Sequence, residues 1–202
     1  MSDTPIDVFI DLPSFPGPVQ AGRLWSHFRK GRESASFEYN KEWLANPHRF
    51  ALEPLLPLAA GTFHTNPGQS VFGAIGDSTP DRWGRILMRR AELARARTAN
   101  ESPHTLSELD YLLRVNDEAR QGALRFSQDG GQSFCAPPGS TPSPPLVNLS
   151  RLLHAADHFC RDDENAEDLR LLLAPGSSLG GARPKASVKD KKGNLCIAKF
   201  PR

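Results

Sequence analysis

The residues of this chain that could do chemistry gather near its end, where a glycine- and serine-rich stretch precedes a lysine on a short apolar run. The stretch 176–181, GSSLGG, contains Gly176, Gly180 and Gly181 together with two serines. Lys199 lies within the run 196–200, CIAKF. Glycine lets backbone N–H groups approach an anion without obstruction from a Cβ atom, and an ammonium neutralises the anion's charge. This pattern is typical of a phosphate-binding loop.

The spacing alone leaves another interpretation open. Ala182 follows Gly181, so the stretch contains neither G-x-x-x-x-G-K-[ST] nor G-x-G-x-x-G. An ordinary glycine-rich turn, followed by a lysine on a solvated hairpin, accounts for the same residues.

The elements that must position these residues are a helix and a hairpin. Leu169, Leu172 and Leu173 recur at helical spacing and predict a helix that ends at 174–175, so the glycine-rich loop follows a helix. The runs 186–188 and 195–200 have strand composition and flank a turn that contains Gly193. Alternation places Ile197 and Lys199 on one face of the second strand, and Cys196, Ala198 and Phe200 on the other.

Upstream, the runs 6–10 and 19–25 have strand composition and the run 35–39 alternates apolar and polar residues, which together predict a small antiparallel sheet. A short helix at 41–46 and an irregular, Leu- and Pro-rich crossing at 50–60 follow. A further strand is expected at 122–127, GALRFS. The predicted fold class is α+β, with the sheet and its helices preceding the start of a nucleotide-binding lobe.

Two helix starts are predicted from capping residues. Thr79 precedes Pro80 and would cap a helix that runs to about residue 97, with Asp81 in its first turn. Thr105 and Glu108 form the pattern of a capping box for a helix continuing toward residue 115.

The first of these helices is rich in arginine, and its six arginines are Arg82, Arg85, Arg89, Arg90, Arg95 and Arg97. Such a face either docks an acidic partner, or DNA held by a partner, or is simply solvated; the pattern favours a solvated face.

The stretch 128–148 is rich in Pro, Gly and Ser, which cannot continue a helix and bury little surface. We expect it to link an N-terminal subdomain, 1–127, to a second region, 149–202, which opens with an amphipathic helix at 149–159.

Composition excludes several classes of protein. The net charge of +2 gives no global preference for nucleic acid or an anionic membrane. The three cysteines are widely spaced and show no C-x-x-C, which argues against a disulfide framework or a zinc site and favours the cytosol. No run approaches the ~20 apolar residues of a membrane span, and the first residues do not resemble a signal peptide. The sequence predicts a cytoplasmic protein with no membrane partner.

SSLGGARPKA followed by IAKFP resembles the loop and lysine strand of the HipA-type toxin kinases, serine/threonine kinases of bacterial type II toxin–antitoxin systems. FGAIGDSTPDRWGRILMRR and ELDYLLRVNDEARQGALRF are similar to two further segments of the family, in the same order. The resemblance implies ATP and Mg²⁺ as cofactors, an antitoxin of the HipB type as partner, contact with DNA only through that antitoxin, and a protein of the translation machinery as substrate.

The resemblance also assigns roles to residues. Lys199 would pair with the α- and β-phosphates of ATP, the backbone of Ser178, Leu179, Gly180 and Gly181 would cover them, and Lys185 would supply a second cation. Ser178 matches the loop serine whose autophosphorylation inactivates members of the family, and Ser177 would share that role; for both, hydroxyl capping of a turn is the alternative.

The carboxylates that a kinase needs for catalysis and for Mg²⁺ are not recognisable, since no H-R-D or D-F-G tripeptide occurs and the sequence ends three residues after Lys199. We therefore expect the N-terminal part of a kinase, inactive alone, with no catalytic residue of its own. The alternative is a non-catalytic binding module, either a split-toxin subunit or a truncated gene product, that docks an antitoxin or a separate catalytic lobe.

Overall fold

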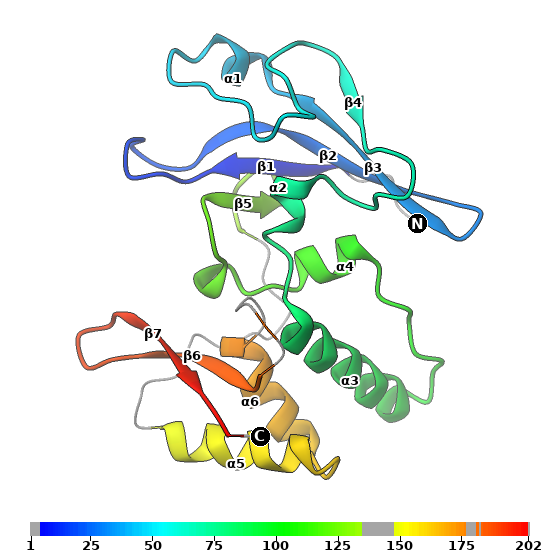
Figure 1. Cartoon of the computed structure of the whole chain (residues 1–202), viewed down its shortest axis with the longest axis vertical. Coiled ribbons are helices and arrows are strands. Elements are labelled where there is room, and N and C mark those ends of the chain that lie inside the picture. Colours follow the sequence, from blue (N-terminus) through cyan, green and yellow to red (C-terminus); the bar gives the residue numbers. More distant parts are fainter. Residues whose placement is uncertain (1–4, 135–147, 177–180, 182, 202) are drawn as a thin grey trace. The chain divides into compact units, whose positions relative to one another are not determined.

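The structure, a computed structural model, describes residues 5–134, 148–176, 181 and 183–201 (Figure 1). These residues divide into two compact units. Unit 1 comprises residues 1–78, 107–113 and 121–135, and unit 2 comprises 79–106, 114–120 and 136–202. The predicted division placed 79–106 and 114–120 with the first domain, whereas these segments pack within unit 2.

Unit 1 is built on an antiparallel sheet of five strands in the order β4-β3-β2-β1-β5 (Figure 1). The strands are β1 (Ile6–Ile10), β2 (Val19–Arg29), β3 (Arg32–Tyr39), β4 (Thr62–His64) and β5 (Leu124–Ser127). The predicted sheet and α+β class are confirmed. β2 is longer than predicted because Lys30 and Gly31, at φ 49° and 75°, form the tight left-handed turn that lets two long strands pair to their ends.

The core of unit 1 lies on this sheet and contains the fully buried rings of Phe37, Trp43 and Phe72. The Tyr39 hydroxyl donates to the carbonyl of Leu56 at 2.7 Å and accepts from the Leu52 amide at 3.0 Å. One buried hydroxyl therefore fixes the irregular crossing at 50–60 to the sheet, which satisfies backbone groups that no helix or strand pairs.

The helices of unit 1 are short: α1 (Lys41–Ala45), α2 (Gly73–Gly76) and α4 (Glu108–Leu113). The predicted capping box at Thr105 is wrong by two residues. Ser107 and Asp110 form it, since the Asp110 amide donates to the Ser107 hydroxyl at 3.1 Å and the Ser107 amide donates to the Asp110 carboxylate at 2.8 Å. The Glu33 carboxylate also accepts from the Glu108 amide at 2.8 Å.

Unit 2 contains α3 (Arg82–Ala99), the 3₁₀ turn η1 (Asp117–Ala119), α5 (Leu149–Cys160), α6 (Ala166–Gly176) and the hairpin β6 (Lys185–Lys189) and β7 (Leu195–Lys199). The helices α3, α5 and α6 and the hairpin share a core in which the rings of Trp83 and Phe159 pack edge to face, with their centroids 4.9 Å apart. Trp83 is thus a core residue, and its packing explains why α3 belongs to unit 2.

The start of α3 differs from the prediction. Asp81, not Thr79, is the N-cap, because its Oδ1 accepts from the Gly84 amide at 2.8 Å while Pro80 stays outside the helix. Thr79 instead accepts from the Arg85 guanidinium at 3.1 Å. The helix ends at Ala99, two residues later than predicted, where Asn100 turns into the left-handed region.

Candidate functional site

The predicted hairpin is present, and its register sets Lys185 directly opposite Lys199 in the ladder of β6 and β7. Gly193 lies in the connecting turn at φ 83°, and the Asp190 carboxylate accepts from the amides of Lys192 and Asn194 at 2.8 and 2.9 Å. The two lysines singled out from the sequence are therefore neighbours across two strands.

The two faces of β7 differ in burial only toward its end, since Cys196, predicted on the face of Ala198 and Phe200, is exposed. Phe200, just past the strand, is buried in the core of unit 2 and Ala198 packs against that core, whereas Ile197 and Lys199 are exposed. Within the described residues, the Lys199 ammonium has no hydrogen-bond or ion-pair partner.

Lys185 is in a different environment, with only 2% of the residue exposed. Its ammonium donates to the Asp81 carboxylate at 2.8 Å and to the Gly181 carbonyl at 2.9 Å. The predicted role of Lys185 as a second phosphate cation stays a prediction, and its charge is already balanced by a carboxylate.

Trp83 adds two further bonds between α3 and the end of the glycine-rich loop. Its indole N–H donates to the Lys185 carbonyl at 3.0 Å, and its amide donates to the Gly181 carbonyl at 3.4 Å. Sequence reasoning found neither Asp81 nor Trp83 as a site residue. In the sequence, an aspartate and a tryptophan at a helix start are explained as a helix cap and a core residue, so nothing there marks them as site residues.

The structure brings together Gly181, Lys185 and Lys199 from the predicted set. The predicted loop residues Ser177, Ser178, Leu179 and Gly180 lie outside the described residues, so their roles stay predictions. α6 ends at Gly176, directly before them and one residue later than predicted.

Two of the six arginines of α3, Arg90 and Arg95, form ion pairs within unit 2. Arg90 binds the carboxylates of Asp162 and Glu164, and its guanidinium lies 4.2 Å from the centroid of the Phe159 ring. Arg95 binds Glu92 and Glu101 at 2.8 and 2.7 Å. Because their charges are paired internally, Arg90 and Arg95 contribute less to a surface that could dock an acidic partner.

Glu92 is the most strongly perturbed acid in the helical part of unit 2. It is 3% exposed and accepts hydrogen bonds from Arg95, the His104 amide and Arg114 at 2.8, 3.2 and 3.2 Å. The Arg95 hydrogen bonds, with those of His104 and Arg114, lower the pKa of Glu92 to about 2. This cluster ties α3 to the segments that follow it.

The search of the described part of the chain for metal ligands found no cluster of three or more His, Cys, Asp or Glu side chains. The His158 Nδ1 instead pairs with Asp168 at 3.0 Å, which raises the pKa of that imidazole. A separate search of the same residues found no helix with the length and apolar character needed to cross a membrane.

Comparison with known proteins places the chain in a family. A search of curated proteins gave no match. The family model described as the HipA N-terminal domain matches residues 17–127, which is more than half of the 202 residues and includes both similar segments upstream of the linker. The glycine-rich loop and the lysine strand lie beyond the matched residues. By this match, the chain belongs to the HipA family through its N-terminal domain.

Proposed function

We propose that this chain is the N-terminal part of a HipA-type toxin, an ATP-dependent serine/threonine kinase of a type II toxin–antitoxin system, and that it contributes a phosphate-binding part of the ATP site. The observation that carries the proposal is the exposed side chain of Lys199, which lies opposite Lys185 in the ladder and has no partner among the residues that the structure describes. Gly181, at the end of the glycine-rich loop, is bonded to that same Lys185.

The electrostatics of the hairpin support an anion at Lys199. Two like charges directly opposite in an antiparallel ladder repel each other, because their Cβ atoms lie about 5 Å apart. Asp81 offsets the charge of Lys185, so one net positive charge is left on the exposed face. A phosphate group would be attracted there without displacing any ion pair that the described residues form.

In the proposed complex, Lys199 neutralises the α- and β-phosphates while backbone N–H groups of residues 178–181 cover them. ATP supplies the γ-phosphoryl group, with Mg²⁺ as its counter-ion. The hydroxyl of a serine or threonine on a protein of the translation machinery accepts that group, an assignment that follows from the family alone. Carboxylates that orient the hydroxyl and hold Mg²⁺ are not assigned to this chain, and we propose that it does not transfer phosphate by itself.

Ser178, with Ser177, is the proposed autophosphorylation site. A phosphate there adds nearly two negative charges beside the phosphates of ATP, and the resulting repulsion would empty the site. The proposed partner is an antitoxin of the HipB type, and DNA is reached only through it.

A second candidate function is that of a non-catalytic docking module, which an exposed apolar face on β7 favours. Leu195 and Ile197 are 48% and 53% exposed on a strand with no third neighbour in the described sheet. Such a surface fits a separate catalytic lobe. The double variant Leu195→Ser, Ile197→Ser should bind a separately produced catalytic lobe more weakly in a pull-down assay. Unchanged binding would show that docking does not use β7.

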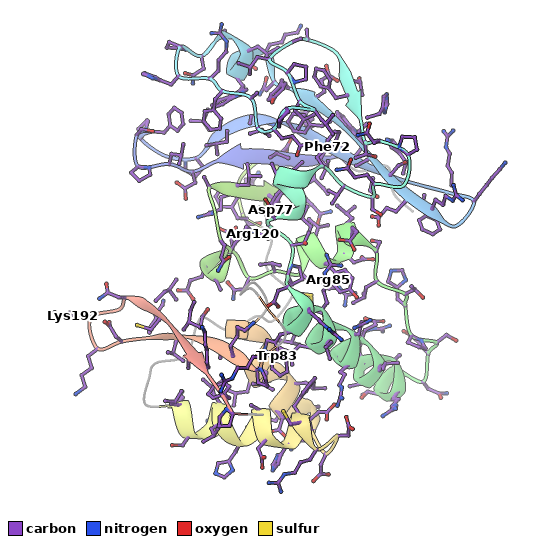
Figure 2. All side chains as sticks on the ribbon, viewed as in Figure 1. Phe72, Asp77, Trp83, Arg85, Arg120 and Lys192 are labelled. Atoms are coloured by element: carbon purple, nitrogen blue, oxygen red, sulfur yellow. The ribbon has the colours of Figure 1, made fainter. Side chains whose placement is uncertain are left out.

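Titration calorimetry with Mg-ATP tests the leading proposal. With only the loop and one lysine contributing, we expect weak binding, with a Kd on the order of 1 mM. Lys199→Ala should abolish the signal. Lys192→Ala is the matched control, because Lys192 is an exposed lysine at the turn of the same hairpin (Figure 2). Equal binding by the wild type and Lys199→Ala would reject the assignment of Lys199.

A further inference from the structure

The Asp81 carboxylate makes two different bonds at the start of α3. Its Oδ1 caps the helix through the Gly84 amide at 2.8 Å, and its Oδ2 accepts from the Lys185 ammonium at 2.8 Å. The side chains of Asp81 and Lys185 are only 10% and 3% exposed. A buried pair of this kind is held firmly, because separating it leaves an uncompensated charge in the interior.

Lys185, which is held by Asp81, also bonds the described end of the glycine-rich loop. Its ammonium also donates to the Gly181 carbonyl at 2.9 Å, and that carbonyl accepts from the Trp83 amide at 3.4 Å. Gly181 has φ 96°, a conformation that glycine adopts without strain. Gly181 is thus bonded to Trp83 of α3 directly and to Asp81 through Lys185. Asp81 and Lys185 are 104 residues apart in the sequence.

We propose that Asp81 is a positioning residue for the glycine-rich loop and acts through Lys185 and the Gly181 carbonyl. The proposal rests on the function proposed above and deepens it. Asp81 fixes the Gly181 carbonyl, at the end of the loop that the structure describes, and Lys185 serves as the link to that carbonyl. Lys199 then supplies the cation for the phosphates, and the two lysines of the ladder have separate tasks.

Amide hydrogen exchange on the full chain tests the link directly. Asp81→Asn keeps the cap, because asparagine caps a helix as well as aspartate does, but removes the charge that holds Lys185. We expect the amides of Gly181 and β6 to exchange about tenfold or more faster, while the first turn of α3 keeps its protection. Asp81→Glu, which restores the carboxylate, should recover much of the protection.

A matched control is Asp157→Asn, which removes an exposed carboxylate paired with Arg161 in the same unit and should leave the exchange of β6 unchanged. A purely stabilising role for Asp81 would instead lower protection evenly over unit 2. That even pattern, or unchanged exchange at Gly181 and β6 in Asp81→Asn, would overturn the positioning role.

Mg-ATP titration separates this inference from the proposed function. We expect Asp81→Asn to weaken binding about tenfold at a temperature where the variant is fully folded. Wild-type affinity in that variant, together with loss of binding in Lys199→Ala, would overturn the positioning role and leave the nucleotide site standing. A wild-type chain that binds no Mg-ATP would overturn the proposed function, and with it the role of Asp81 in phosphate binding.

Discussion

Replacing Glu92 by Gln removes the charge at the centre of the arginine cluster in unit 2. Glu92 is buried, and its carboxylate accepts from two guanidinium groups and one amide. The variant keeps the size of the side chain and an amide oxygen as acceptor. It therefore isolates the contribution of the negative charge to the free energy of unfolding.

The magnitude follows from the pKa of Glu92. The pKa falls from 4.5, its ordinary value, to about 2 in the folded chain. That difference corresponds to about 3 kcal/mol of stabilisation. Because the folded pKa is the lower one, the stabilisation is complete above pH 4.5 and is lost as the pH falls through about 2. At pH 7, Glu92→Gln should therefore lower the free energy of unfolding by about 2–3 kcal/mol.

Urea unfolding followed by circular dichroism at about 222 nm measures this free energy, and repeating it at several pH values tests the sign. The gap between the wild type and Glu92→Gln should shrink as the pH falls below 4.5. Glu101→Gln is the matched control: Glu101 binds the same Arg95 at 2.7 Å but is 59% exposed, so its loss should cost less than about 1 kcal/mol. A gap that does not change with pH, or equal effects of the two variants, would refute the reasoning.

Two further substitutions test contacts of unit 2. Trp83→Phe removes the indole donor of the Lys185 carbonyl and should cost about 1–2 kcal/mol in urea unfolding; an unchanged midpoint would mean that this bond is not formed. His158 has a raised pKa because it donates to Asp168, so the pair stabilises the fold fully below pH 6.5 and ceases to do so as the pH rises through the raised value. Thermal unfolding of His158→Gln should lack this loss of stability as the pH rises above 6.5, and a wild-type pH profile in the variant would contradict the assignment.

The regular elements could be predicted from the sequence because their signals are local. Strand composition and alternation located β1, β2, β3, β5 and the hairpin, whereas the three-residue strand β4 was missed. Alternation also put Phe200 and Lys199 on opposite faces, and the structure buries Phe200 and exposes Lys199. Helix caps were less predictable. Thr79 has the residue type of a cap, but Asp81 stands next to the helix and its carboxylate reaches the Gly84 amide.

The pairing of Asp81 with Lys185 was beyond sequence reasoning, since no local pattern joins residues 104 positions apart. The same contact explains why the units interleave along the chain. α3 follows the sheet of unit 1 in sequence, but the bonds of its first turn with β6 and the burial of Trp83 place it in unit 2. Periodicity predicted an amphipathic helix there and could not show which core its apolar face would join.

The most direct test of the proposed ATP site is a map of backbone amide chemical shifts during titration with Mg-ATP. We predict that the largest changes lie in the glycine-rich loop, at Gly181 and along β7 around Lys199, that the sheet β1–β5 is unaffected, and that Lys199→Ala abolishes the changes. Changes confined to unit 1, or a map that is the same in Lys199→Ala, would contradict the assignment of the loop and the lysine strand as the phosphate-binding site.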